Sequence, residues 1–216
     1  MKLYNTVRNE AEASQIIEKS KFTAHVRPVQ TREEAESFIT EIKNSYKDAT
    51  HNVPAMVIGD KFQIQWASDD GEPQGTSGAP IVQMLVKEEI TNVVIVVTRY
   101  FGGIKLGTGG LVRAYTSSAK LGLEAAGICS VQEVCRMKIS IEYTSLAKLQ
   151  SMAAQTLETD TPPQGEFTIE DAAYSDKVVL DIRTLPENEE HVRNIFANVT
   201  SGSAEVIEAE TVCEKV

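Results

Sequence analysis

Five consecutive β-branched apolar residues, Val93 to Val97, lie near the middle of the chain with no polar residue among them. A run without alternation is typical of a strand that is buried on both faces. Eight of the thirteen glycines fall within residues 71–110, on either side of this run. Glycine is used where the backbone takes a positive φ or approaches another group closely. The segment 69–115 therefore predicts a central buried strand with glycine-rich connections around which the remaining chain is built.

The stretch after this strand, residues 98–110, reads TRYFGGIKLGTGG, and an amphipathic segment begins at Leu111. A strand, a glycine loop and a helix start in this order bring free backbone N–H groups and the positive end of a helix dipole to one point. We therefore expect an anion-binding loop made of Arg99, Tyr100, Gly102, Gly103, Lys105, Gly107, Gly109, Gly110 and Arg113.

Aromatic and cationic residues of this loop allow two interpretations. Tyr100 and Phe101 could offer faces on which nucleic acid bases stack, with Lys120 as a further cation. Alternatively, the rings pack into the core, the glycines mark tight turns, and the cations neutralise Asp69 and Asp70. The sequence leaves both interpretations open.

A second polar cluster precedes the buried strand. Its predicted site residues are Asp69, Asp70 and Glu72 in a turn, Gly75, Thr76 and Gly78 in the next loop, and His51 before an earlier strand. Clustered carboxylates can hold Mg²⁺ or act as acid and base, and a histidine can act as a general base. The structural alternative is that the carboxylates accept loop N–H groups or pair with Arg99 or Arg113, and that His51 is a hydrogen-bonded loop residue. We expect the structural role, with no catalytic residue and no metal.

The helix after the glycine loop is expected to end at Gly127 and to turn Arg113 away from its apolar stripe. That stripe comprises Leu111, Ala114, Tyr115, Ser118, Leu121 and Ala125. Earlier in the chain, Thr31 and Glu34 form a capping box before a helix, and strands are expected over residues 21–26, 53–58 and 62–67.

Beyond Gly127 the hydrophobic pattern starts again. Strands are expected over 136–142, 165–173, 177–183 and 204–210, with helices over 145–156 and from Pro186, which is the β-α-β-β-α-β order of ferredoxin-like domains. Residues 1–128 carry 14 Lys and Arg against 15 Asp and Glu, whereas residues 129–216 carry 7 against 16. We therefore predict two domains, 1–128 and 133–216, joined by a linker over 128–132.

The motifs DDGEPQGTSGAP and VTRYFGGIKLGTGGLVRAY, with ATHNVPAMVIGD before them, together resemble the signature of the Impact/YigZ family over roughly residues 15–127. The resemblance implies an α+β protein. Its N-terminal domain would be a two-layer α/β domain similar to domain IV of elongation factor G and to small-molecule kinases. Its ferredoxin-like C-terminal domain would be similar to the last domain of that factor. Two positions depart from the family's usual pattern: Ser45-Tyr46 stands where a His-aromatic pair is common, and Val53 where Cys is frequent. The first departure argues against a metal-ligating histidine pair.

Location is suggested by what the sequence lacks. No apolar run approaches 18 residues, and the first residues contain no apolar signal segment. Cys129, Cys135 and Cys213 show no C-x-x-C spacing and are odd in number, which is typical of free thiols in a reducing compartment. We expect a cytoplasmic protein without a membrane partner.

Function is the least constrained property. Eukaryotic members of the resembled family regulate translation under amino-acid starvation, through protein contacts of an extra domain that is not found in this sequence. We expect a non-enzymatic regulator, without a cofactor, that binds RNA, the ribosome or translation factors. An enzyme acting on a small phosphorylated substrate through the glycine loop is the first alternative. A protein-interaction module with an acidic C-terminal domain is the second.

Overall fold

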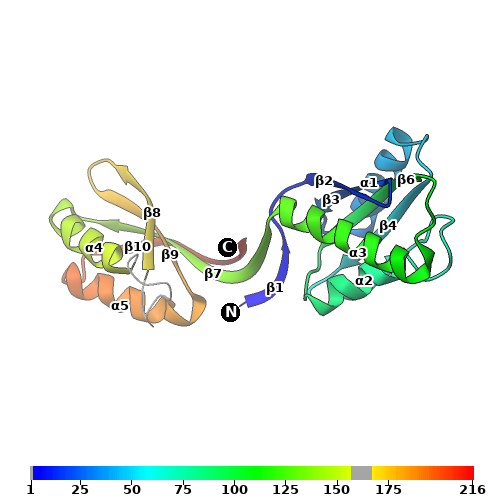
Figure 1. The fold of residues 1–216 in the computed structure, drawn as a ribbon. Coiled ribbons are helices and arrows are strands. Elements are labelled where there is room, and N and C mark those ends of the chain that lie inside the picture. The colour runs from blue at the N-terminus through cyan, green and yellow to red at the C-terminus, as the bar shows by residue number, and fades with distance from the viewer. Residues whose placement is uncertain (1, 157–166) are drawn as a thin grey trace. The chain divides into compact units, whose positions relative to one another are not determined.

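Two compact units make up the chain in the computed structural model, which describes residues 2–156 and 167–216 (Figure 1). The N-terminal unit comprises Leu3–Val131 with the last two residues, and the C-terminal unit comprises Gln132–Glu214 with the start of the chain. Residues 128–132, the expected linker, lie in the strand β7 (Ile128–Ile141). Independent folding of the two units stays a prediction.

The N-terminal unit contains both strands and helices. Its elements are β1 (Lys2–Val7), β2 (Ala11–Ile17), β3 (Ser20–Pro28), α1 (Arg32–Ser45), β4 (His51–Ile58), β5 (Ile64–Ala67), α2 (Gly78–Lys87), β6 (Val93–Tyr100) and α3 (Gly107–Ala126). The hairpin of β2 and β3 was not predicted from the sequence. Its two-residue turn is Glu18-Lys19, both with positive φ, whereas such turns are usually signalled by Asn or Gly.

One antiparallel sheet with the strand order β2-β3-β6-β4-β5 forms the middle of this unit. All five residues from Val93 to Val97 in β6 are fully buried, as predicted. Helix α1 packs Phe38 and its neighbours against Val94 and Val96, while α2 and α3 pack on the side of Val93, Ile95 and Val97. The two-layer expectation is therefore wrong, because helices cover both faces of the sheet (Figure 1).

The capping residue and the apolar spacing predicted helix α1 correctly. Thr31 is its N-cap, and the Thr31 hydroxyl accepts the N–H of Glu34 at 3.2 Å. The carboxylate of Glu34 reaches back to the N–H of Gln30 instead of that of Thr31. Ala35, Phe38, Ile39 and Ile42 form its buried face, as their spacing predicts.

Helix α3 starts earlier than predicted and buries a different stripe. Leu111, Ala114, Tyr115 and Ser118 are buried as expected, but Leu121 and Ala125 are exposed. Gly122 and Leu123 lie inside instead. A Cβ at Gly122 would stand 2.7 Å from Cγ2 of Val26 and 2.9 Å from Cβ of Ala24. Gly122 thus permits the close approach of α3 to β3.

The C-terminal unit follows the predicted order of elements. They are β7, α4 (Tyr143–Thr156), β8 (Phe167–Tyr174), β9 (Val178–Thr184), the 3₁₀ turn η1 (Pro186–Asn188), α5 (Glu189–Val199) and β10 (Glu205–Lys215). Strand β7 pairs with both β9 and β10, and β9 pairs with β8. Alternate residues of β7 and β9 form a core with Leu149 of α4 and Phe196 of α5. Residues 165 and 166, predicted to start a strand, lie outside the described residues.

Within the two described ranges, no helix is long and apolar enough to cross a lipid bilayer.

Replacing Gly122 by valine is expected to destabilise the N-terminal unit, since the added atoms collide with β3. Overpacking of this kind costs about 1–3 kcal/mol of unfolding free energy. Ala125→Val on the exposed side of the same helix is the control, and its cost should stay near the difference in helix propensity, about 0.5 kcal/mol. Urea unfolding of both variants measures the difference. Equal losses would show that α3 does not rely on close packing at Gly122.

Candidate functional site

The predicted anion-binding loop is divided between three elements. Arg99 and Tyr100 end strand β6, residues 101–106 connect, and Gly107, Gly109 and Gly110 already belong to the first turn of α3. The expectation of one continuous loop over 98–110 is therefore wrong. Arg99 is held on the sheet, opposite Phe22 of β3 and His51 of β4.

A buried ion pair joins this strand to the acidic turn. Nη1 of Arg99 lies 2.5 Å from Oε1 of Glu72, and the two side chains are only 6% and 4% exposed. The same oxygen accepts the hydroxyl of Tyr115 of α3 at 2.6 Å. Burial, and then the hydrogen bond to Glu72, raises the pKa of Tyr115 far above its usual value, so that the hydroxyl keeps its proton and donates. Glu72 thereby connects β6 to α3.

His51 completes this cluster with a defined tautomer. Its Nδ1 lies 2.8 Å from the carbonyl oxygen of Asp70, and because a carbonyl only accepts, Nδ1 carries the proton. Its Nε2 lies 3.8 Å from Oε2 of Glu72. The shorter bonds of this cluster use Nδ1 of His51 and Oε1 of Glu72. Nε2 of His51 and Oε2 of Glu72 take no part in them.

The three carboxylates of the acidic turn point to different partners. Asp69 accepts the N–H groups of Gly75, Ser77 and Gly78 and the hydroxyl of Ser77, at 2.6–3.1 Å. Asp70 pairs with Lys43 at 2.6 Å and accepts the N–H of Asn52. Together with Glu72 they bind protein groups, in agreement with the structural alternative, although Asp70 pairs with Lys43 instead of an arginine.

Asp69 fills the anion position at the start of helix α2. Partial burial alone would raise its pKa, but the hydrogen bonds from Ser77, Gly75 and Gly78 outweigh that effect and hold the pKa below its usual value. A helix N-terminus favours negative charge in the same sense. The predicted site residues Gly75, Thr76 and Gly78 therefore serve this turn: Thr76 donates its hydroxyl to the carbonyl of Pro73.

A cleft of about 380 Å³ opens beside the Arg99–Glu72 pair. It is bounded by the end of β6, the acidic turn and the first turn of α3, and its lining comprises Thr50, His51, Glu72, Pro73, Arg99, Phe101, Lys105, Leu106, Gly107, Thr108 and Leu111. The structure thus brings five of the predicted site residues to one cavity: His51, Glu72, Arg99, Lys105 and Gly107. Gly109 and Gly110 stand between the lining residues Thr108 and Leu111 in the chain but are not themselves part of the lining.

The start of α3 differs from that of α2 in having no internal anion. Leu106 occupies the N-cap position, no side chain caps the helix, and no acidic residue lies in its first turn, within the described residues. Gly107 has a φ of +68°, and a Cβ there would meet nothing within 4 Å. Glycine at this position therefore serves the backbone turn that aims the first N–H groups of α3 at the cleft.

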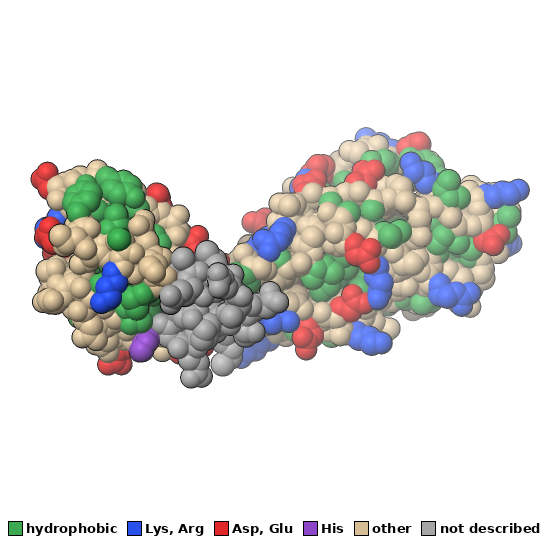
Figure 2. Space-filling model, turned by 60° about the vertical axis from the view of Figure 1, so that its left-hand side comes forward, with side chains coloured by type: hydrophobic (Ala, Val, Ile, Leu, Met, Phe, Trp, Pro, Cys, Tyr) green, Lys and Arg blue, Asp and Glu red, His purple; other side chains and the backbone are tan. Residues whose placement is uncertain are grey.

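The four cations proposed from the sequence have different roles. Arg99 is neutralised by Glu72, and Lys120 forms an ion pair with Glu88. Lys105 and Arg113 are exposed, and no ion pair involves either of them in the described part of the chain. The face of the N-terminal unit drawn in Figure 2 shows Lys and Arg mixed with Asp and Glu. Of these four cations, Arg99 and Lys105 line the cleft, and Lys105 has no carboxylate partner among the described residues.

Tyr100 and Gly102 are structural. The hydroxyl of Tyr100 bonds to Asp48, and a Cβ at Gly102 would stand 2.1 Å from the backbone of Lys19. Phe101, by contrast, is 46% exposed at the cleft. The sequence analysis missed Tyr115 and Ser20 as partners of this cluster. The place of Tyr115 in the predicted apolar stripe could have indicated such a role, because a buried hydroxyl needs a hydrogen-bond partner. The sequence around Ser20 contains no comparable signal.

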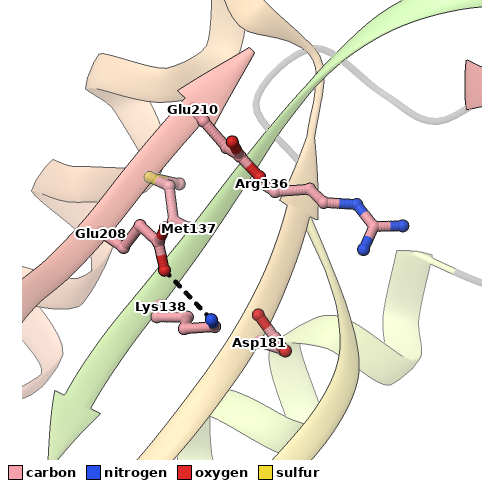
Figure 3. A pocket seen from close by; sticks show the side chains of 6 residues that line it. All are labelled: Arg136, Met137, Lys138, Asp181, Glu208 and Glu210. Carbon is pink, nitrogen blue, oxygen red and sulfur yellow. Dashed lines mark hydrogen bonds and ion pairs between the residues drawn. The ribbon is translucent and has the colours of Figure 1, made fainter. Parts of the chain in front are cut away.

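A smaller hollow in the C-terminal unit, about 110 Å³, lies between charged side chains of β7, β9 and β10 (Figure 3). Lys138 pairs with Glu208 at 3.0 Å, and Arg136 pairs with Glu214. Both lining cations are paired within the unit, and Asp181 and Glu210 add negative charge, so the hollow is less suited than the cleft to an anionic ligand.

Replacing Glu72 by glutamine should strongly destabilise the protein, because the charge of Arg99 stays buried without a counter-charge. Breaking such a pair costs about 3–5 kcal/mol. Glu88→Gln, which breaks the exposed pair with Lys120, should cost no more than about 1 kcal/mol. Guanidinium unfolding at pH 7 measures the unfolding free energy of both variants. Similar losses would show that the buried pair of Arg99 and Glu72 stabilises the fold no more than an exposed pair does.

Asp69→Asn should cost about 0.5–2 kcal/mol at neutral pH, since it weakens the cap of α2. The folded-state pKa of Asp69 is lowered, so its contribution is present above the ordinary value of about 3.9 and disappears as the pH falls through the folded value. The stability difference from wild type should therefore shrink in acid, as urea unfolding at a series of pH values can measure. Asp60→Asn, in an exposed turn, should show no such trend, and a constant difference for Asp69→Asn would contradict the capping role.

Comparison with known proteins places this arrangement in a family. The profile of the Impact N-terminal domain matches residues 18–123. IMPACT family member YvyE of Bacillus subtilis is 37% identical over 207 residues, covering 96% of this chain and 91% of YvyE. IMPACT family member YigZ of Escherichia coli is 33% identical over 141 residues, covering 64% of this chain and 69% of YigZ. The crystal structure of a hypothetical protein aligns with a TM-score of 0.57 and 27% identity, over 95% of this chain and 97% of the other. The chain belongs to the IMPACT family.

Proposed function

We propose that this IMPACT family member is a regulator of translation that binds single-stranded RNA of the translation machinery at the cleft of its N-terminal unit. The observation that carries this proposal is the uncapped N-terminus of α3 beside Lys105 and the exposed ring of Phe101. Backbone N–H groups and a lysine attract phosphate, and an aromatic face stacks on any base.

The arrangement of elements in the two units also supports a role in translation. The C-terminal unit has the β-α-β-β-α-β order with β7 between β9 and β10, which is the ferredoxin-like arrangement. We propose that this unit corresponds to the last domain of elongation factor G, and the N-terminal unit to its domain IV, as the family resemblance implies. Both correspondences favour a partner within the translation machinery.

A second candidate function, an enzyme acting on a small phosphorylated substrate, rests on His51. Its Nε2 lies in the cleft, 3.8 Å from a carboxylate oxygen of Glu72, where it could take up a proton from a bound group. The hydrogen bonds that engage Glu72 and the other carboxylates with protein groups favour the binding function instead. Release of inorganic phosphate from sugar phosphates or nucleotides, lost in His51→Gln with the fold intact, would establish the enzyme.

RNA binding at the cleft must depend on salt, because each neutralised phosphate releases counterions. Lys105 lines the cleft, and Arg113 is an exposed cation of α3 outside the lining. We expect a bound strand to reach both, which gives a slope of log K against log salt of about −1.4, from about −0.7 per phosphate of a single strand. Lys105→Ala and Arg113→Ala should each shallow the slope by about one half and weaken all sequences alike. Fluorescence anisotropy with a short unstructured RNA over a salt series measures these slopes.

Lys120→Ala is the matched control, because Lys120 is exposed on the same helix but already pairs with Glu88. It should leave both affinity and slope unchanged. Absence of RNA binding at low salt, or equal effects of all three substitutions, would refute RNA recognition at this cleft. Co-sedimentation of the full chain with ribosomes over the same salt series tests whether the RNA is ribosomal.

A further inference from the structure

We infer that the cleft beside Arg99 accommodates a single nucleotide, with its phosphate at the first turn of α3 and its base against Phe101. This inference rests on the proposed binding function and names the unit of ligand that the cleft accepts. The shared chemistry is that of a nucleoside monophosphate, whether free or at the phosphorylated end of an RNA strand.

The phosphate position is defined by the start of α3 together with an independent group. Arg99 lines the cleft, its side chain is 6% exposed, and its Nε has no hydrogen-bond partner within the described residues. A buried donor without a partner is rare in folded proteins and calls for an acceptor. Lys105, Gly107 and Thr108 line the same cavity, and no side chain caps the N–H groups at the start of α3 among the described residues. Anionic oxygens at this position would therefore meet several donors.

The remaining lining fits a base and sugar. Apolar surface comes from Phe101, Leu106, Leu111 and Pro73, while Thr50, His51 and Glu72 add polar groups. Phe101 has one face toward the guanidinium of Arg99, whose Cζ lies 5.4 Å from the ring centroid. The ring and the guanidinium, which Glu72 neutralises, thus form one flat wall, which suits a stacked base.

The volume of the cleft limits the ligand to one nucleotide. The volume of about 380 Å³ lies near the lower end of the range for small-molecule sites, roughly 300–1,000 Å³. A phosphate end has oxygens free for several N–H donors, whereas a phosphate inside a strand is flanked by nucleotides on both sides. The cleft therefore predicts a preference for a terminal over an internal phosphate.

Calorimetric titration of the full chain with the four 5′-nucleoside monophosphates tests this inference. The nucleotides should bind, and the matching nucleosides and inorganic phosphate should bind at least tenfold more weakly, because each lacks one half of the ligand. Phe101→Ala should weaken nucleotide binding roughly 5- to 150-fold, the equivalent of a lost stacking contact of about 1–3 kcal/mol. Lys105→Ala should weaken it without affecting the thermal unfolding temperature, because Lys105 is exposed and forms no ion pair with a described residue.

Trp66→Ala is the matched control, because Trp66 is an aromatic side chain of similar exposure, 39%, on β5 and outside the lining of the cleft. It should leave nucleotide affinity unchanged. If Trp66→Ala and Phe101→Ala have equal effects, or if inorganic phosphate binds as tightly as the nucleotides, the inference is overturned.

Short RNAs with a 5′-phosphate or a 5′-hydroxyl separate this inference from the proposed function. Tighter binding of the phosphorylated strand, with displacement by free nucleotide, supports both. RNA binding that is indifferent to the 5′ end and to free nucleotide overturns the inference and leaves the proposed function standing. Nucleotide binding without any RNA binding supports the inference with a free nucleotide as the source and overturns the proposed function. Binding of neither ligand overturns both.

Discussion

The buried ion pair between Arg99 and Glu72 is the interaction on which the candidate site depends. A charged pair with almost no exposure loses the hydration of both charges, so further hydrogen bonds to its groups are needed to offset that cost. Tyr115 supplies a hydroxyl to the carboxylate, and His51 approaches its second oxygen. The result is that strand β6, strand β4, the acidic turn and helix α3 meet at one carboxylate, and the cleft lies beside it.

The N-termini of α2 and α3, both in the N-terminal unit, follow glycine-rich segments but have different roles. The first N–H groups of α2 are held by Asp69, so that position is closed to an external anion. The first turn of α3 has no such carboxylate among the described residues, and Lys105 lies next to it. The difference arises from a single residue whose side chain folds back onto the helix. It explains why ligand binding is assigned to α3 and not to the other glycine-rich turn.

Charge in this protein is balanced locally more than its net value of −10 suggests. In the C-terminal unit, Arg136, Lys138 and Arg183 each pair with glutamates of β10. In the N-terminal unit, Lys105 and Arg113 are exposed and form no ion pair with a described residue. An acidic protein can therefore bind an anion, because the screening length in physiological salt is about 8 Å and distant carboxylates contribute little.

Several features were determined by the sequence alone, because they depend on neighbouring residues. The apolar run of β6, the Thr31 cap of α1, the turn between β4 and β5 and the order of elements in the C-terminal unit follow from local pattern. The family signature in residues 69–115 is of the same kind. Burial of β6 on both faces even conflicted with the two-layer expectation that came from the resemblance, and the residue pattern was the better guide.

Tertiary structure alone decided the partners of the charged residues. Asp69, Asp70 and Glu72 lie within four positions, yet their carboxylates reach α2, α1 and β6 respectively. Pairings such as Glu72 with Tyr115, 43 positions apart, depend on how helices pack on the sheet, which no local pattern encodes. For the same reason Arg99 looked like a free ligand for an anion in the sequence, whereas packing makes it a neutralised wall of the cleft.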